Sequence, residues 1–102
     1  FTSKATKGTE VLYSTTSSKS KQMAQIMQRN MIARLGTYDR GAKARPDLIV
    51  LNSTNMPAIL IETAFLTNDE DAQKLKSSEF NKKVGQVVYD SIIEIFNTLS
   101  FR

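Results

Sequence analysis

Hydrophobic and polar residues follow distinct patterns along this chain, and these patterns predict strands, a loop and helices. In residues 8–14, GTEVLYS, Val11 and Tyr13 alternate with Leu12 within a composition rich in strand-forming residues, which predicts a strand. Residues 48–52 and 58–62, LIVLN and AILIE, are continuous apolar runs, which are typical of strands covered on both faces in a largely parallel sheet. Only five residues separate these runs, fewer than a parallel crossover takes, so their pairing stays open. The mixed charges, glycine and proline of residues 37–47 predict a loop.

Amphipathic periodicity predicts two longer helices, over residues 20–35 and 78–99. Gly36 is suited to end the first helix, and the three methionines within it favour core packing over an adaptable binding surface. Between these two helices, a capping Thr67 or Asn68 followed by Asp69, Glu70 and Asp71, which suit the positive end of a helix dipole, predicts the start of a short helix. With the strands, these helices predict an α/β fold: an open, largely parallel twisted sheet covered by helices on both faces.

The composition limits the chemistry that this chain can perform alone. Its 102 residues amount to about one small domain, and no apolar run approaches the roughly 20 residues of a membrane-spanning helix. Cysteine and histidine are absent, which excludes thiolate and imidazole groups as nucleophiles, bases or metal ligands. The net charge of +4 suits an anionic partner, but without a basic stripe or aromatic clusters a nucleic-acid binder is disfavoured.

Glu62 is the candidate for a functional carboxylate, because it ends an apolar run just before a polar helix start. Ligands of open α/β sheets bind at the carboxyl ends of strands, so this side chain is expected to reach a cleft from a central strand. The alternative is a carboxylate at the rim, paired with Arg40, Lys43 or Arg45 of the preceding loop. Position alone favours this ion pair.

Three segments read together change that balance. GTEVLYS, DRGAK and LIVLNSTNMPAILIETAFLTNDEDAQKL, followed by a terminal helix, resemble the C-terminal part of the zinc-dependent N-acetylmuramoyl-L-alanine amidases of the Amidase_3 family. The resemblance runs from about Gly8 to Ile95, and its most specific element extends from Met56 through Glu62 to Asn68. It implies that residues 1–102 are the C-terminal part of a single amidase catalytic domain.

The resemblance also implies an activity. Members of this family hydrolyse the amide between the lactyl group of N-acetylmuramic acid and L-alanine in peptidoglycan, with zinc held by two histidines and a glutamate. Glu62 matches the family's catalytic carboxylate, which takes a proton from zinc-activated water and passes it to the leaving nitrogen. The zinc ligands are expected before Phe1, so no residue of this chain is a metal ligand and the chain alone is expected to be inactive. The implied partners are peptidoglycan and the N-terminal part of the domain, in the cell wall outside a bacterium.

Three further residues are weaker candidates for contact with substrate. Asn52 and Thr54 precede the second apolar run and could line a substrate groove, although turn hydrogen bonding is the favoured alternative. Arg40 is suited to attract stem-peptide carboxylates, and equally to neutralise neighbouring acids. The competing function is a non-catalytic wall-binding or regulatory module that keeps the fold without the metal site.

Overall fold

The sheet of this protein has three strands in the part of the chain that the structure describes. A computed structural model describes residues 6–65 and 68–101. β1 (Thr9–Tyr13) lies between β2 (Asp39–Ala44) and β3 (Ile59–Glu62), in the order β2-β1-β3. β1 pairs in parallel with β2 and antiparallel with β3.

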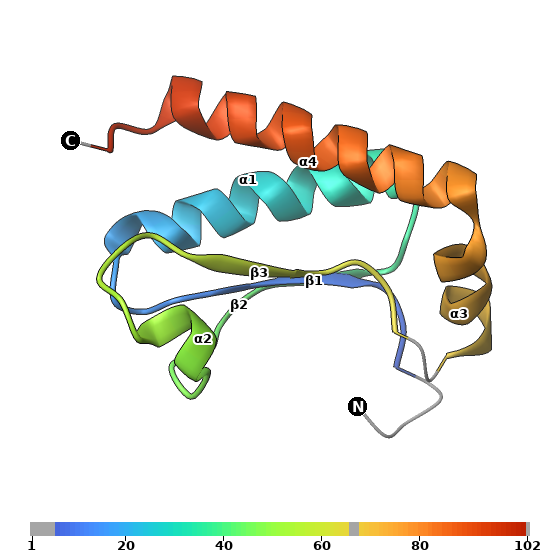
Figure 1. The fold of residues 1–102 in the computed structure, drawn as a ribbon, viewed down its shortest axis with the longest axis horizontal. Helices are drawn as coiled ribbons and strands as arrows, with labels where there is room; N and C mark the ends of the chain where they lie inside the picture. Colours follow the sequence, from blue (N-terminus) through green and yellow to red (C-terminus); the bar gives the residue numbers. More distant parts are fainter. Residues whose placement is uncertain (1–5, 66–67, 102) are drawn as a thin grey trace.

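The predicted α/β class is confirmed, but the sheet is mixed rather than largely parallel. The connection from β2 to β3 stays at one end of the sheet and does not cross back over it (Figure 1). The chain therefore enters β3 in the direction opposite to β2, as it does after any connection that returns at the same end.

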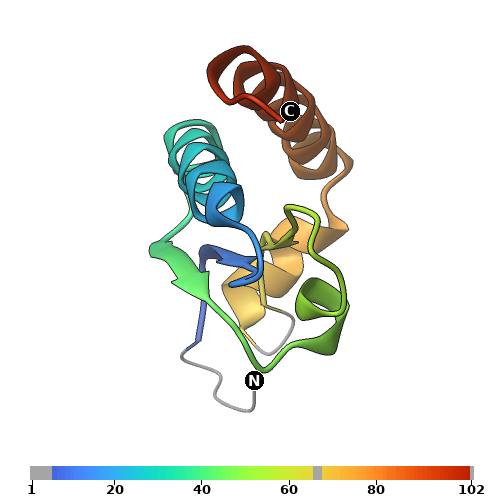
Figure 2. The same cartoon turned by 90° about the vertical axis from the view of Figure 1, so that its left-hand side faces the viewer.

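Two long helices form a layer on one face of the sheet, and two short helices lie outside this layer. α1 (Ser18–Leu35) and α4 (Ser78–Thr98) lie side by side over one face, whereas α2 (Ile49–Asn52) lies on the opposite side (Figures 1 and 2). α3 (Asp69–Lys76) stands at the end of the sheet and leads into α4. The helices predicted over residues 20–35 and 78–99 are confirmed. Within the described residues, no helix is both long and apolar enough to cross a membrane.

Local signals in the sequence set the ends of these helices. Gly36 has the left-handed φ of 66° and donates its N–H to the carbonyl of Ile32, so it ends α1 as predicted. Asn68 caps α3, because its Oδ1 accepts a hydrogen bond of 3.1 Å from the backbone N–H of Asp71. Thr67, the other predicted cap, lies outside the described residues.

Two predicted elements between α1 and β3 are wrong. The apolar run 48–52 forms α2 and not a strand, and only Leu51 of this helix is buried, whereas Ile49 is 82% exposed. A short apolar run does not by itself distinguish a strand from a helical turn. The predicted loop 37–47 contains β2, an edge strand whose charged and glycine-rich sequence lacks the alternation of a half-buried strand.

The main core lies between the sheet and the α1–α4 layer. Val11 of β1 is fully buried there, and the partly buried Ile59 and Ile61 of β3 pack against the same cluster. Met27 and Met31 of α1 are buried, which confirms the prediction that these methionines belong to the core. The buried members are Val11, Ala24, Ile26, Met27, Met31, Val87 and Ile95.

Gly8 is required where the chain enters β1, and this gives a first prediction. Its φ is 101°, and a Cβ added there would lie 2.2 Å from the carbonyl oxygen of Tyr38. That carbonyl cannot yield easily, because it accepts a 2.8 Å hydrogen bond from the N–H of Thr9. We expect Gly8→Ala to lower the free energy of unfolding by about 2 kcal/mol or more, measured by urea denaturation of the complete domain.

Gly85→Ala is the matched control for this prediction. Gly85 lies inside α4, and a Cβ there meets no atom within 4 Å. The same substitution should therefore stabilise the helix by about 0.5 to 1 kcal/mol. Equal stability of the two variants would contradict the steric role of Gly8.

Candidate active site

Glu62 lies at the end of β3, directly opposite Glu10 of β1. Because β3 runs antiparallel to β1, the Glu62 carboxylate is at the end of the sheet where β1 and β2 begin. β3 is the edge strand of the described sheet and not the central strand that the sequence predicted. Cross-strand partners project to the same face, so Glu10 and Glu62 are neighbours on the side of the sheet away from α1.

The cations near Glu62 are paired with other acids. The Glu10 side chain is only 4% exposed, and its Oε2 lies 2.9 Å from Lys43 Nζ and 3.6 Å from Arg40 Nε. Arg45 pairs with Asp47, with 2.8 Å between Nη2 and Oδ2. Among the described residues no cation forms an ion pair with Glu62, so the predicted rim ion pair is not present.

Burial raises the pKa of Glu62, and the neighbouring carboxylate of Glu10 raises it further. Arg45 and Arg40 oppose this rise through their positive charges. A carboxyl with a raised pKa exchanges protons more readily near neutral pH, which is the property that a general base and acid needs.

A bulge in β2 places Arg40 beside this carboxylate pair. The register runs from Thr9 opposite Asp39 to Val11 opposite Ala42, so β2 contains one extra residue. Gly41 takes up the bulge with a φ of 83°. Bulges redirect side chains, and the Arg40 guanidinium lies over the ring of Phe65, 5.2 Å from its centroid.

Asp71 braces the segment that follows Glu62, and the sequence reading missed this role. Its side chain is 1% exposed, and its Oδ2 accepts 2.9 Å hydrogen bonds from the N–H groups of Gly8 and Phe65. One carboxylate thus joins the start of β1 to the residues just after β3. Sequence reading explained Asp71 through the dipole of α3, because nothing local in the sequence indicates partners 63 residues away.

The structure places Asn52 and Thr54 at the other end of the sheet from Glu62, near the residues that follow β1. Asn52 accepts a hydrogen bond from the N–H of Thr15 and donates to the carbonyls of Arg45 and Leu48. Thr54 Oγ1 accepts from the N–H of Met56. Both side chains thus serve the turn, as the alternative predicted, and contact of Asn52, Thr54 or Arg40 with substrate stays a prediction.

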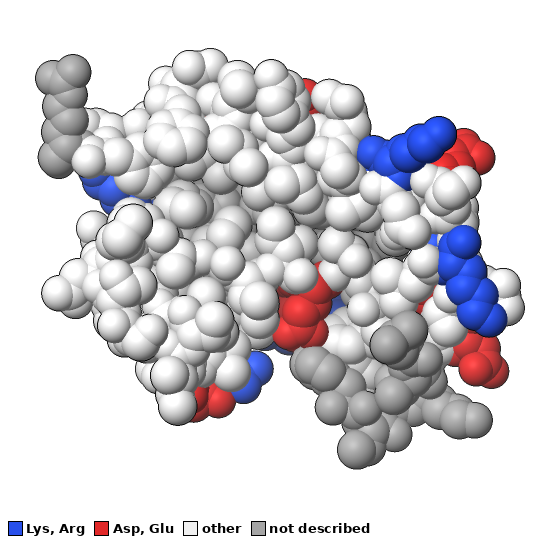
Figure 3. All heavy atoms as spheres, viewed as in Figure 1, with Lys and Arg blue, Asp and Glu red and all other residues white. Residues whose placement is uncertain are grey.

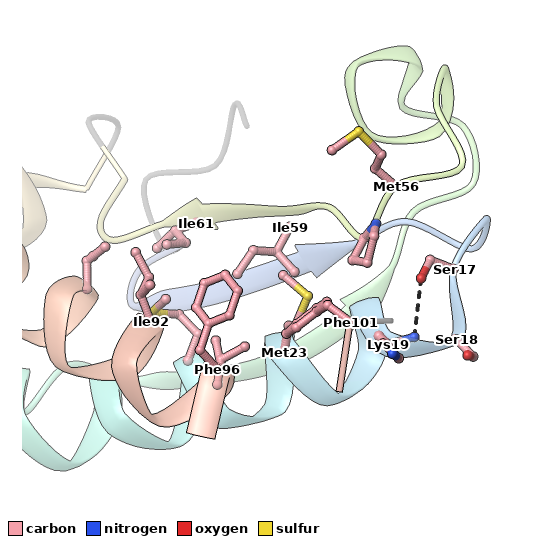
Figure 4. Close-up of a pocket in the computed structure, with 14 residues that line it drawn as sticks. Ser17, Ser18, Lys19, Met23, Met56, Ile59, Ile61, Ile92, Phe96 and Phe101 are labelled. Atoms are coloured by element: carbon pink, nitrogen blue, oxygen red, sulfur yellow. Dashed lines mark hydrogen bonds between the residues drawn. The ribbon is translucent and has the colours of Figure 1, made fainter. Parts of the chain in front are cut away.

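An apolar groove of about 730 Å³ opens between β3 and the two long helices. Ile59 and Ile61 of β3 point into it from one side, and Ile92 and Phe96 of α4 point into it from the other (Figure 4). Phe96 is 65% exposed, and the surface over α4 and β3 carries few charges (Figure 3). The groove lies along the edge of β3 that has no partner strand within the described residues.

Comparison with known proteins identifies the family of this chain. Residues 1–94 match the family model Amidase_3, which describes N-acetylmuramoyl-L-alanine amidases. The chain belongs to this family. The segment with Glu62 and the residues that surround it all lie within the match.

Individual Amidase_3 relatives agree with this assignment. The N-acetylmuramoyl-L-alanine amidase LytC of Bacillus subtilis (strain 168) is 38% identical over 91 residues, which are 87% of this chain and 18% of LytC. The crystal structure of an N-acetylmuramoyl-L-alanine amidase from Clostridium difficile 630 superposes with a TM-score of 0.87 at 27% identity, over 94% of this chain and 52% of that chain. The catalytic domain of CwlV, the amidase from Bacillus (Paenibacillus) polymyxa var. colistinus, gives 0.84 at 32% identity, over 95% and 52%. The chain thus spans about half of these solved structures.

The described residues of this Amidase_3 chain do not form a zinc site. They contain no group of three or more His, Cys, Asp or Glu side chains that could hold a metal ion. Glu10 and Asp71, the buried acids nearest to Glu62 in the fold, are occupied by Lys43 and by backbone N–H groups. Their chemistry is that of structural partners and not of free metal ligands.

Proposed function

We propose that residues 1–102 are the C-terminal part of an amidase catalytic domain that hydrolyses the bond between N-acetylmuramic acid and L-alanine in peptidoglycan. The observation that carries this proposal is Glu62, a half-buried carboxylate without an ion pair among the described residues, at the end of a strand inside the family match. A purely structural carboxylate in such a place would be expected to pair with one of its cationic neighbours.

Glu62 acts as general base and then as general acid in the proposed reaction. Its carboxylate accepts a proton from the water that attacks the lactyl carbonyl carbon, and a tetrahedral adduct forms. The C–N bond then breaks, and the same proton passes from Glu62 to the nitrogen of L-alanine, so that the products are a carboxylic acid and a free amine. The raised pKa of Glu62 assists the first transfer, because it makes the carboxylate a stronger base toward the attacking water.

Zinc is the proposed cofactor, and its ligands belong to the part of the domain outside these residues. The same part is proposed to cover the free edge of β3 and the apolar groove beside α4. Two observations support this: the solved relatives are about twice as long as the matched region, and an uncovered strand edge beside exposed apolar side chains is a hazard for association. Peptidoglycan as substrate places the enzyme in the bacterial cell wall, outside the cell.

The proposal predicts different behaviour for the complete domain and for residues 1–102 alone. The complete domain should bind zinc and release free L-alanine amino groups from peptidoglycan, and a chelator should abolish that release. Residues 1–102 alone should do neither, because they contain no His or Cys, and carboxylates favour harder cations. Calorimetric titration and an amino-group assay measure both; a complete domain that binds wall without hydrolysis would instead support a non-catalytic module.

A further inference from the structure

We propose that Glu10 is a positioning residue of this active site: it holds Arg40 and Lys43, and so leaves the carboxylate of Glu62 unpaired. The inference rests on the proposed function, because it concerns the surroundings of the proposed catalytic group. The family resemblance implies no role for Glu10, and the sequence predicts it only as part of a strand.

The order of the strands puts Glu10 between the catalytic carboxylate and the cations. Glu62 lies opposite it on β3, and Lys43 and Arg40 contact it from β2, on the other side of β1. Lys43 pairs in register with Leu12, two residues from Glu10, so Lys43 and both acids project to the same face of the sheet. The strand order therefore places Glu10, and not Glu62, beside these cations.

Burial decides which acid binds the cations. The Glu10 side chain is 4% exposed and cannot be solvated by water, whereas Glu62 is partly exposed. An ionised carboxylate that has lost its hydration needs a cationic partner far more than one at the surface does. Arg40 is fixed further by the β2 bulge and by its position over Phe65, so it is not free to turn to Glu62.

An unpaired Glu62 has a clear chemical use. A salt bridge to arginine would stabilise the ionised carboxylate, lower its basicity and so oppose the first proton transfer of the proposed reaction, in which Glu62 accepts a proton from water. Among the described residues, the charged groups that act on Glu62 are Glu10 from β1, Arg40 from β2 and Arg45 from the residues after β2. Arg45 forms a hydrogen-bonded ion pair with Asp47, whereas Arg40 Nε lies 3.6 Å from Glu10 Oε2, within ion-pair distance but without a hydrogen bond.

Two substitutions with opposite expected effects test the proposal in the complete domain. Glu10→Gln keeps the shape of the side chain but removes its charge and frees the cations, so the pKa of Glu62 should fall. The acidic limb of the kcat/KM profile should then move to lower pH by about 1 unit. Arg40→Gln removes a cation from the same cluster and should move this limb to higher pH. Direct charge effects alone give the same two signs, so the double variant decides: if Glu10 holds Arg40, Arg40→Gln should raise the pKa of Glu62 more in the Glu10→Gln background than in the wild type. Equal shifts in the two backgrounds would show that Glu10 acts only through its own charge.

A second readout and a control separate this inference from the proposed function. NMR titration of the Glu62 carboxyl carbon in both variants measures the same shifts without turnover, so an inactive wild-type domain would refute the function and still leave Glu10 testable. Glu94→Gln, which removes an ion pair with Arg29 between α4 and α1, should change neither profile nor titration. If Glu10→Gln does not fold, Lys43→Gln replaces it, with an expected rise in the pKa of Glu62. Unchanged values, or shifts of the same sign for Glu10→Gln and Arg40→Gln, would overturn the proposal.

Discussion

Glu62→Gln in the complete domain is expected to lower amidase turnover by about 10² to 10⁴-fold, the usual contribution of a general acid or base. Glutamine keeps the shape of the side chain but cannot accept and return a proton. Zinc content should stay near that of the wild type, because Glu62 is proposed to move protons and not to hold the metal. The same preparation is assayed for released amino groups and for bound metal.

The stability of Glu62→Gln is a second, independent test of whether Glu62 is a catalytic carboxylate or part of a rim ion pair. The fold raises the pKa of Glu62, so the folded state favours the protonated carboxyl group. The ionised carboxylate therefore lowers the free energy of unfolding. This loss is complete above the pKa of the folded state and absent below the ordinary pKa of the unfolded state. At pH 7 a neutral glutamine removes that penalty, and the free energy of unfolding should stay the same or rise by up to about 1 kcal/mol. A rim ion pair predicts the reverse: lower stability with turnover kept. A folded, zinc-loaded variant with near-normal turnover would remove Glu62 from the mechanism.

The elements that the sequence predicted well are those whose side chains carry a periodic pattern. β1, α1 and α4 alternate or repeat with the period of an element that packs on the core, whereas β3 is indicated by its continuous apolar run. Residues 39–44 contribute only the partly buried Ala42 to the core cluster, which is too little for a periodic pattern, because β2 is an edge strand of the described sheet and is paired through its backbone to β1. Backbone hydrogen bonds leave no signature in side-chain polarity, which is why the sequence predicts a loop where the structure has this strand.

The residues of the candidate site also differ in whether the sequence can predict them. Glu62 could be found because a carboxylate at the end of an apolar run is a local anomaly, and a family resemblance then gave it a role. Glu10 could not be found, since its importance comes from cross-strand register with Glu62 and from a bulge that brings Arg40 to it. Register and bulges depend on which strands pair, and the sequence left that pairing open.

Asp71 shows most clearly how a distant residue supports the candidate site. Its carboxylate holds the N–H of Gly8, two residues before Glu10, and the N–H of Phe65, three residues after Glu62. The two carboxylates at the site therefore lie on strands whose ends are tied to one buried oxygen. The relative position of Glu10 and Glu62 depends on this tie as well as on the strand pairing.

Asp71→Ala is therefore expected to destabilise the complete domain strongly. It leaves two buried N–H groups without an acceptor, at about 1 to 3 kcal/mol each, so the free energy of unfolding should fall by about 3 kcal/mol or more. Asp71→Asn is the matched variant, because its amide oxygen can still accept both hydrogen bonds; it should retain more than half of the lost stability. Urea denaturation of the two variants measures this difference. If Asp71→Ala lowered the free energy of unfolding by less than about 1 kcal/mol, the segment after β3 would be held by other contacts. The hydrogen bonds of Asp71 would then not determine how the ends of the two strands are placed.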